Sequence, residues 1–348
     1  MIVDTGSADG TPELIESIMQ EYGIPGEIHH REWVNFAHNR QQALDLAVST
    51  GRADWLLFID ADEELAWTED HWFRHLVPGL TYQLEKHHGP IRYPLPNLIW
   101  VRDIAWRWEG VVHECIKADR EHPRQLLKNV WIIYHSGEGY RSRGVSTKVK
   151  YLRDAELLEE ALRVNPDDAR SQFYLAQSCR DAGEYERAYL HYERRVHLGG
   201  WPEEVFIAQC EKAALAIGLG LGHDCIVGQH LSAFSLRPTR AESLWQLAVY
   251  CRERQRYAEG YIYAKVAKDI PMPAADLLFL RPAVYAWQLL DEFAICAYWA
   301  GFYQEAAEAG QKILIENRFE PEHRPRLEAN LQFALQRLQF PPPVIKAR

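Results

Sequence analysis

A repeat of about 34 residues in the second half of the chain constrains its fold more than any other feature. Four prolines mark it, spaced by 36, 36 and 33 residues: Pro166, Pro202, Pro238 and Pro271. Three segments share an aromatic residue followed three positions later by Ala or Gly, at 183–188, 256–260 and 301–306. A small residue there lets the second helix of a pair pack closely on the first. The pattern predicts an all-helical domain over residues 141–340, with a tail at 341–348.

The first part of the chain alternates strand-like and helix-like segments. Thr11 is expected to cap a helix that has Pro12 at its first position, and a second helix is expected over residues 36–48. The apolar run at 55–59 is typical of a strand buried on both faces. Further strand-like runs lie at 2–3, 91–93, 98–101 and 130–134. This order predicts an α/β domain with a mostly parallel sheet over residues 1–140, joined to the helical part by a Gly- and Ser-rich segment at 136–144.

Composition argues against several classes of protein. The formal net charge of -10 disfavours non-specific binding to nucleic acid, because a phosphate backbone attracts a basic surface. The six cysteines are widely spaced without a C-x-x-C pair, which predicts reduced thiols in a cytoplasmic protein, not a disulfide framework or a zinc site. The start of the chain does not read as a signal peptide, and no apolar stretch reaches about 18 residues, so no transmembrane segment is expected.

The triplet Asp60-Ala61-Asp62 directly follows the apolar run at 55–59. Ligands of open α/β sheets bind at the carboxyl ends of strands, so both carboxylates are expected to face such a crevice. Two carboxylates one residue apart can hold Mg²⁺ or Mn²⁺, which then bridges the phosphates of a nucleoside diphosphate. A D-x-D triplet alone also occurs in solvated turns, so its meaning depends on the motifs around it.

The turn Asp4-Thr5-Gly6-Ser7 has two interpretations. D-T-G-S is the catalytic turn of aspartic proteases, but those enzymes need two such turns on an all-β fold, and here a helix is expected directly afterwards. In an α/β domain the same turn ends a strand, where Asp4 and Thr5 could hydrogen-bond a base or a ribose. The second interpretation fits the rest of this region better.

Five elements in order along the chain resemble the family-2 glycosyltransferases of GT-A fold. Residues 3–11 are similar to their D-x-G-S-x-D-G-T turn, 33–43 to their F-x-x-x-R-N helix, and 58–63 to their D-x-D-E motif. Residues 110–114 and 134–137 resemble the G-x-V-H-E and H-x-G elements of a subgroup that carries tetratricopeptide repeats and includes S-glycosyltransferases of bacteriocin peptides. The resemblance spans essentially the whole chain. It implies a GT-A-like (Rossmann-like) domain followed by a tetratricopeptide-like helical domain.

The resemblance also implies roles for individual residues. Nucleotide-sugar binding is implied for Asp4, Thr5, Gly6, Arg40, Asp60 and Ala61, with Arg40 beside the diphosphate. Binding of Mn²⁺ or Mg²⁺ is implied for Asp62 and Asp60, and His135 could add a third ligand or donate to a phosphate. Glu114 is the predicted general base that activates the acceptor, with His113 and Glu109 as rivals. The alternatives for Glu114 are that it only binds the acceptor, or that it pairs with Arg102 or Arg107.

Two departures from the family pattern affect these expectations. The family has a further strand before the segment that matches the start of this chain, so we expect the α/β domain to lack its first strand, with donor affinity in question. The second departure is Gln41, where the family usually has Asn. An exposed sheet edge at Ile2 would favour pairing, so a homo-oligomer is a further expectation.

These features predict a metal-dependent, inverting glycosyltransferase. It would move a sugar from a nucleotide-diphosphate sugar, such as a UDP-sugar, to a peptide, protein or glycan held by the helical domain. One alternative is a non-enzymatic scaffold whose repeats bind a partner while the α/β part is degenerate. Another is a nucleotidyltransferase, but the Gly-rich loop with Lys or Arg that such enzymes carry after their first strand is missing.

Overall fold

The computed structural model describes residues 1–88, 91–135, 146–276 and 278–339. The chain divides into two compact units, Met1–Tyr174 and Leu175–Arg348, which are described one at a time. The predicted domain boundary at residue 140, most of the Gly- and Ser-rich join at 136–144, and the tail at 341–348 lie outside the described residues.

The first unit opens with a small parallel sheet. Strand β1 (Ile2–Asp4) pairs with β2 (Ile28–His30), and helix α1 (Thr11–Tyr22) connects the two strands. The predicted helix is confirmed, but Gly10 is its N-cap, because the cap requires a left-handed backbone (φ 81°) that glycine adopts without strain. Thr11 lies one residue inside the helix, where its hydroxyl donates to Asp9 Oδ1 at 2.6 Å.

A five-stranded sheet follows, in the order β3-β6-β5-β9-β4. Its strands are β3 (Trp55–Leu57), β4 (Glu63–Trp67), β5 (Thr81–His88), β6 (Ile91–Trp100) and β9 (Arg124–Tyr134). Only β5 and β9 are parallel, and the other three pairs are antiparallel. The predicted mostly parallel sheet is therefore wrong. Two residues separate β5 from β6, which is too few for the crossover that a parallel pair needs.

Both faces of this sheet carry apolar side chains, because successive residues of a pleated strand point to opposite faces. Leu56 pairs with Ile99 on the face covered by helix α2 (Phe36–Ser49), where Leu44 joins the core. Leu57 pairs with Leu98 on the opposite face, in a second core around Tyr82, Leu84, Val130 and Ile132. Strand β3 itself is only partly buried, and Ile59 is 43% exposed. The prediction that residues 55–59 form a fully buried strand is wrong, because the strand ends at Leu57.

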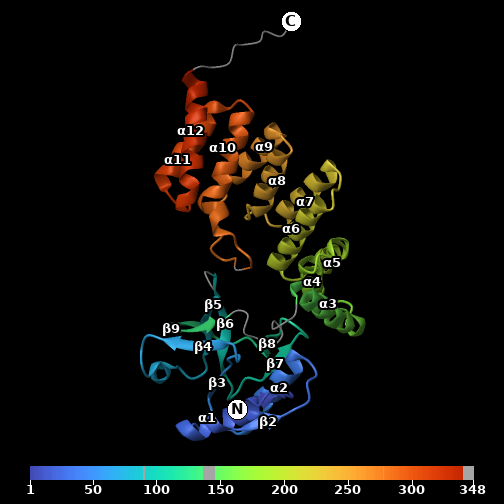
Figure 1. Cartoon of the computed structure of the whole chain (residues 1–348), viewed down its shortest axis with the longest axis vertical. Coiled ribbons are helices and arrows are strands. Elements are labelled where there is room, and N and C mark those ends of the chain that lie inside the picture. The colour runs from blue at the N-terminus through green and yellow to red at the C-terminus, as the bar shows by residue number, and fades with distance from the viewer. Residues whose placement is uncertain (89–90, 136–145, 277, 340–348) are drawn as a thin grey trace. The chain divides into compact units, whose positions relative to one another are not determined.

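A short antiparallel hairpin and one helix complete the first unit (Figure 1). The hairpin pairs β7 (Trp106–Glu109) with β8 (Cys115–Ala118), and Trp106 and Ile116 extend the core under α2. Helix α3 (Thr147–Val164) begins at Ser146, whose side chain accepts from the amide of Val149. A single 3₁₀ turn, η1 (Trp72–His75), lies between β4 and β5.

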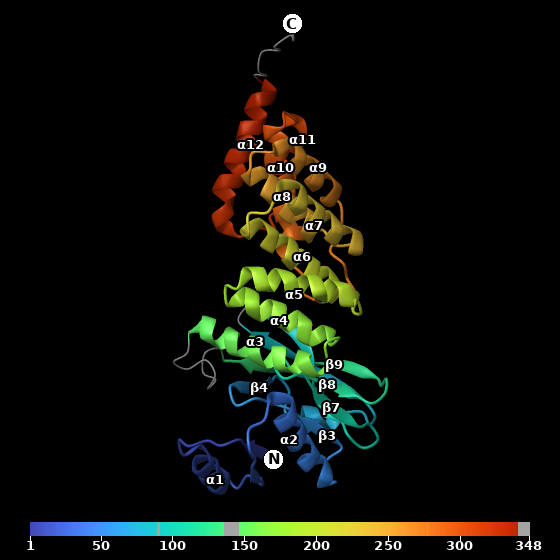
Figure 2. The ribbon, with the colours of Figure 1, turned by 90° about the vertical axis from the view of Figure 1, so that its right-hand side faces the viewer.

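The second unit is helical throughout its described residues (Figures 1 and 2). The boundary between the two units falls within helix α4 (Ala169–Asp181), whose residues from Leu175 onward belong to the second unit. Its remaining elements are α5 (Tyr185–Leu198), α6 (Pro202–Gly218), α7 (His223–Leu236), α8 (Glu242–Glu253), α9 (Tyr257–Ala267), the π-helix η3 (Val284–Gln288), α10 (Leu289–Trp299), α11 (Tyr303–Glu316), the short η4 (Pro321–His323) and α12 (Arg324–Gln339). Successive helices from α5 to α12 pack on one another, as the repeat predicts.

The small residues of the repeat lie where helices touch. Ala188, Gly260 and Ala306 follow the starts of α5, α9 and α11 and are all buried. A Cβ atom on Gly260 would lie 2.8 Å from Cys296 Sγ and 3.2 Å from the Ala248 carbonyl, so α8, α9 and α10 can pack this closely only around a glycine. None of the described helices is long and apolar enough to cross a membrane.

Candidate functional site

The site begins where β3 leaves the sheet. Asn97 of β6 holds the chain at Phe58 twice: its carbonyl accepts from the Phe58 amide at 2.8 Å, and its side-chain Nδ2 donates to the Phe58 carbonyl at 3.0 Å. The chain then turns, and the Glu63 amide donates to the Asp60 carbonyl at 3.0 Å. The triplet at 60–62 therefore forms a tight turn between β3 and β4.

Glu63 fixes the geometry of this turn. Its Oε2 accepts from the Asp60 amide at 2.9 Å, and its Oε1 forms an ion pair with Lys86 of β5. The Glu63 side chain is 2% exposed, and the ammonium of Lys86 also lies over the Tyr134 ring, 5.2 Å from its centroid. Burial works against the charge on Lys86, but the bond to Glu63 outweighs it and raises the pKa of Lys86. This buried pair holds the turn from inside the sheet.

Arg40 of α2 connects the turn to a second carboxylate. Its Nη2 donates to Asp60 Oδ1 at 2.5 Å, and its Nε donates to Glu114 Oε1 at 2.6 Å. The guanidinium also lies over the Trp108 ring, 5.0 Å from its centroid. Burial opposes the charge, but the two carboxylates prevail and raise the pKa of Arg40. Arg40, predicted to lie beside a diphosphate, bridges Asp60 and Glu114 in this structure.

Glu114 reaches Arg40 because of the loop that joins β7 to β8. Gly110 has a φ of 99°, and a Cβ atom there would lie 3.3 Å from the Val112 carbonyl, so the loop needs a glycine. His113 is also left-handed, with a φ of 53°. The Glu114 side chain is 14% exposed. Within the described chain, no donor is bonded to its Oε2, so one carboxylate oxygen stays open to a ligand.

The two rivals for the role of base are engaged elsewhere. The His113 ring stacks on Tyr174, with centroids 4.1 Å apart, and its carbonyl accepts from Arg170 Nη2 at 2.7 Å. Glu109 forms ion pairs with Arg107 and, at 2.6 Å, with Lys117. Burial would raise the pKa of Glu109, but the hydrogen bonds from Lys117 and Arg107 lower it. Of the three candidate bases, Glu114 is the one whose carboxylate accepts a hydrogen bond from Arg40.

The turn after β1 is closed by its own aspartate. Asp4 Oδ2 accepts from the Gly6 amide at 3.1 Å, both carboxylate oxygens lie 3.3 Å from the Ser7 amide, and His30 Nδ1 lies 3.3 Å from Oδ2. The hydrogen bond with Ser7 is the largest cause that lowers the pKa of Asp4, and it outweighs burial. Asp4 thus shapes the turn, while Gly6 is exposed at its tip with a φ of 108°. Thr5, partly buried, lies between them.

His135 lies next to the acidic turn through its backbone. Its amide donates to the Asp62 carbonyl at 3.0 Å, and its ring Nε2 lies 3.2 Å from Glu64 Oε2. This places His135 at the same end of β9 and β4 as Asp62. Ala61, at the centre of the triplet, is exposed.

The donor atoms of the site suit a hard divalent cation only in part. Asp60 and Asp62 offer carboxylate oxygens, which are the ligands that Mg²⁺ and Mn²⁺ take. The carboxylate of Asp62 is paired with no cation in the described part of the chain, whereas Asp60 shares one oxygen with Arg40. Across residues 1–88, 91–135, 146–276 and 278–339 no group of three His, Cys, Asp or Glu side chains could hold an ion alone. An ion here would need further ligands from a bound molecule or water.

Several residues of the site went unassigned in the sequence. Gln41 counted only as a departure from the family, yet its Oε1 accepts from the Trp108 amide at 2.8 Å and its Nε2 donates to the Trp106 carbonyl at 3.3 Å. Lys86 carried no signal, because its strand was not recognised and its partner Glu63 lies two strands away in the sheet. The only sequence signal for Glu63 is its position directly after the D-x-D triplet.

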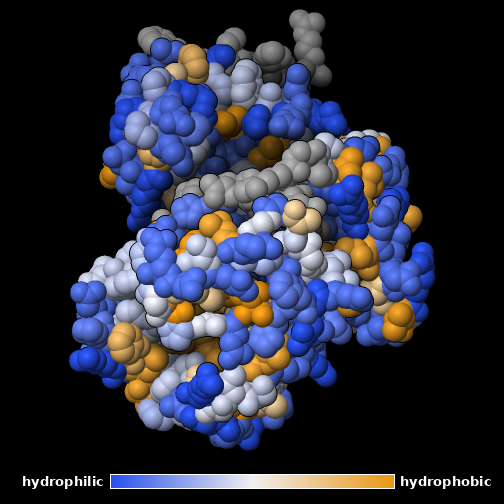
Figure 3. Space-filling model, turned by 60° about the horizontal axis from the view of Figure 1, so that its bottom comes forward, coloured by the Kyte–Doolittle hydropathy of each residue, from blue (hydrophilic) through white to orange (hydrophobic). Residues whose placement is uncertain are grey.

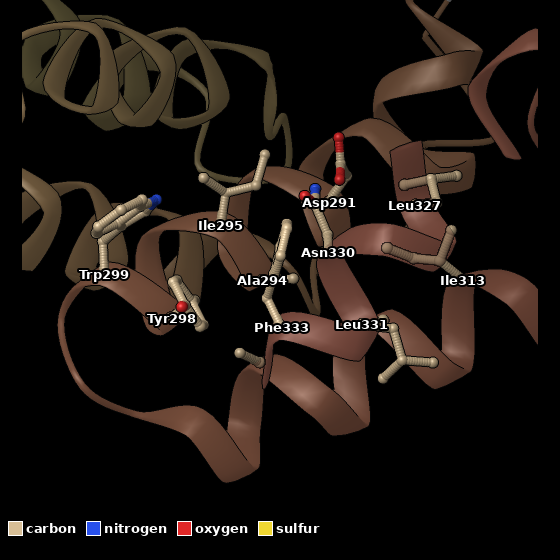
Figure 4. A pocket seen from close by; sticks show the side chains of 12 residues that line it. Asp291, Ala294, Ile295, Tyr298, Trp299, Ile313, Leu327, Asn330, Leu331 and Phe333 are labelled. Carbon is tan, nitrogen blue, oxygen red and sulfur yellow. The ribbon is translucent and has the colours of Figure 1, made fainter. Parts of the chain in front are cut away.

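The second unit contains a pocket of about 140 Å³ between α10, α11 and α12 (Figure 4). It is lined mostly by apolar side chains, among them Tyr298, Ile313, Leu331 and Phe333. Its one carboxylate, Asp291, forms an ion pair with Arg326 at 2.8 Å. The face of the molecule in Figure 3 is mainly hydrophilic, with scattered hydrophobic patches. The pocket holds no constellation of reactive groups, so the candidate site is the one around Arg40.

Comparison with known proteins finds similarity for parts of the chain. Residues 1–81 match the family model of glycosyl transferase family 2. A TPR repeat-containing protein of Synechococcus elongatus is 44% identical over 186 residues, which are 49% of this chain and 42% of that protein. The chain thus spans less than half the length of this relative.

Several solved structures are similar to the helical part. MamA from Desulfovibrio magneticus RS-1 covers 49% of this chain and 86% of its own, at 15% identity and a TM-score of 0.38. YrrB, a TPR protein with an unusual peptide-binding site, covers 55% of this chain and 85% of its own, at 11% identity and a TM-score of 0.37. The chain combines a small α/β domain, in which residues 1–81 match the model of glycosyl transferase family 2, with a helical domain that resembles tetratricopeptide repeat proteins.

Proposed function

We propose that this chain, whose first 81 residues match family-2 glycosyltransferases, transfers a sugar from a nucleotide-diphosphate sugar to a peptide, protein or glycan. The observation that carries the proposal is the bridge from Arg40 to Asp60 and Glu114. It brings the two acidic motifs of the resemblance, which are separated by several strands in the chain, to one cation. In the proposed reaction, the motif with Asp60 serves the donor and the motif with Glu114 serves the acceptor.

The charge of the site supports a donor that arrives with a divalent cation. Asp60, Asp62, Glu63 and Glu114 outnumber the cationic side chains that the described residues pair with them, Arg40 and Lys86. A diphosphate alone would be repelled by this excess of carboxylates. Mn²⁺ or Mg²⁺ held by Asp62 and Asp60 would neutralise the charge that develops on the leaving diphosphate. His135, beside Asp62, is the proposed additional ligand or phosphate donor.

The protein's own groups would then divide the transfer between them. The Oε2 of Glu114 accepts the proton of the acceptor hydroxyl or thiol. At the same time the oxygen or sulfur of the acceptor forms a bond with the anomeric carbon of the sugar. The bond from that carbon to the diphosphate oxygen breaks, and the nucleoside diphosphate leaves with the electron pair. Attack from the opposite face inverts the configuration. Arg40 keeps Glu114 and Asp60 in place, and the turn of Asp4, Thr5 and Gly6 together with Ala61 is proposed to face the nucleotide.

The helical domain is proposed to hold the acceptor. Stacked helix pairs form extended surfaces that bind peptides and proteins, so a peptide or protein acceptor suits this architecture. A UDP-sugar is the proposed donor, with a homo-oligomer as the proposed assembly. None of the six cysteines, all of which are described, forms a disulfide, and a cytoplasmic location is the proposed one.

A non-enzymatic scaffold is the second candidate. The relative with 44% identity is described as a TPR repeat-containing protein, and Arg40 has two of its donors committed to carboxylates. In that case the α/β domain would be degenerate, and the repeats alone would act by binding a partner.

Donor binding by the full chain separates these candidates. A panel of UDP-, GDP- and dTDP-sugars is titrated into the protein with Mn²⁺, with Mg²⁺ and with EDTA, and released nucleoside diphosphate is measured with and without peptide acceptors. We expect metal-dependent binding of one donor that Asp62→Ala abolishes. Glu16→Gln, at an exposed position of α1, is the matched loss of a carboxylate and should bind as wild type does. If no donor binds under any condition, the enzyme proposal is wrong and the scaffold stands.

A further inference from the structure

We propose that Gln41 is a positioning residue, whose side-chain amide sets where the β7–β8 hairpin, and with it Glu114, lies against Arg40. The proposal rests on the function proposed above for its effect on catalysis. Its structural part, the attachment of the hairpin to α2, can be tested without any activity.

The hydrogen bonds of Gln41 join two elements that carry the site. Its Oε1 accepts from the Trp108 amide at 2.8 Å, and its Nε2 donates to the Trp106 carbonyl at 3.3 Å and to Asp45 Oδ1 at 2.8 Å. Trp106 and Trp108 both belong to β7. The amide therefore satisfies a donor and an acceptor of one strand at alternate residues, as a neighbouring strand would.

The position of Gln41 in α2 links this attachment to the placement of Glu114. Gln41 directly follows Arg40, so the two residues bind the same hairpin from adjacent points of one helix. Arg40 contacts the Trp108 ring and Glu114, while Gln41 holds the strand backbone at the residues on either side of Arg107. A shift of the hairpin along α2 would therefore change the distance from Glu114 to Arg40. Displacements of about 1 Å at reacting groups can cost about 100-fold in rate.

The length of the side chain matters as well. Asn, usual in the family, is one methylene shorter, so at position 41 of this chain it would not span both strand groups from the same backbone position. Gln41→Asn should therefore weaken the attachment, and Gln41→Leu should remove it while keeping the volume. Asp45→Ala is the matched control, because it removes the intrahelical partner of Gln41 but leaves both bonds to β7.

Hydrogen exchange followed by mass spectrometry tests the attachment in the full chain. In Gln41→Leu we expect exchange across residues 106–118 to rise about 10-fold, while β5, β6 and β9 exchange as in wild type. Asp45→Ala should match wild type, and Gln41→Asn should fall between. Unchanged exchange at 106–118 in Gln41→Leu would overturn the proposal, whether or not the protein transfers sugars.

Kinetics test whether Gln41 acts through Glu114. Gln41→Leu should lower kcat about 10- to 100-fold and leave the KM for the donor within about twofold. In a Glu114→Gln background the same change should have no further effect on kcat. An equal loss in both backgrounds would show that Gln41 does not act through Glu114. A wild-type protein without activity would refute the proposed function, while the exchange data would still decide the attachment.

Discussion

Arg40 Nε donates to Glu114 Oε1 at 2.6 Å, although the two residues lie 74 positions apart in the sequence. The same guanidinium donates to Asp60 Oδ1 at 2.5 Å, so one cation joins α2, the turn after β3 and the loop of the β7–β8 hairpin. Arg40 itself stays charged at all physiological pH values, because the two carboxylates raise its pKa against the effect of burial. The consequences for activity and for stability differ and can be measured separately.

Removal of the Arg40 charge should affect both properties. Arg40→Met leaves the largely buried Glu114 carboxylate without its partner, which should lower the free energy of unfolding by about 1–3 kcal/mol. Arg40→Lys keeps the charge but loses the fork that reaches both carboxylates, so release of nucleoside diphosphate should still fall at least about 10-fold. Urea unfolding and a coupled release assay measure the two effects. Arg52→Met is the control, because its side chain is 81% exposed and its ion pair with Glu27 spans 4.0 Å, so its effect on stability should stay within about 0.5 kcal/mol.

The loop before Glu114 should not tolerate a side chain at Gly110. Gly110→Ala combines an unfavourable φ of 99° with a Cβ atom 3.3 Å from the Val112 carbonyl, so we expect a loss of about 1–2 kcal/mol in unfolding free energy and a larger loss of activity. Gly79→Ala has a similar φ of 85° but open space around its Cβ atom, which isolates the steric part. Equal activity in the two variants would show that the loop conformation does not place Glu114.

Two glycines within helices of the repeat domain should respond in opposite directions. Gly260→Ala would place its Cβ atom 2.8 Å from Cys296 Sγ and should destabilise the helical domain by about 1–3 kcal/mol. Gly228 lies in the middle of α7 with open space around the position of a Cβ atom. Gly228→Ala should therefore stabilise the helical domain by about 0.5–1 kcal/mol, because alanine favours a helix more than glycine does. Thermal unfolding, followed by the helical circular dichroism signal at about 222 nm, measures both changes in stability. A stabilising Gly260→Ala would show that α8, α9 and α10 are packed less tightly than described.

His230 should make the helical domain sensitive to mild acid. Burial lowers the pKa of His230 to about 4, and neither ring nitrogen has a hydrogen-bond partner in the described part of the chain. Below the ordinary pKa of 6.5 the unfolded chain binds a proton that the folded chain excludes, so stability falls as the pH drops from 6.5 towards 4, by about 1.4 kcal/mol per unit. Urea unfolding between about pH 5 and pH 6.5 tests this, because most carboxyl groups titrate below that range. His230→Leu should flatten that dependence, and an unchanged slope would contradict the assignment.

Much of the fold was predictable because it depends on local patterns. Helical periodicity located the start of α1 and placed α2 to within a residue, and the spacing of prolines and of small residues predicted that the second part consists of paired helices. The predicted apolar runs at 91–93 and 98–101 fall in one strand, β6, which ends at Trp100. Pro94 and Pro96 interrupt the apolar pattern in the sequence but lie within this strand. The wrong predictions, a mostly parallel sheet and a fully buried β3, concern which strands are neighbours.

The sequence by itself determined that this protein has an α/β part with an acidic turn at 60–62 and a helical part built from repeats, because periodicity and turn residues act over a few neighbouring positions. Only the tertiary structure decided that Arg40 bridges Asp60 and Glu114, that Glu63 and Lys86 support the turn, and that Gln41 holds the hairpin. Such contacts depend on strand order and on the path of loops, which no short segment encodes.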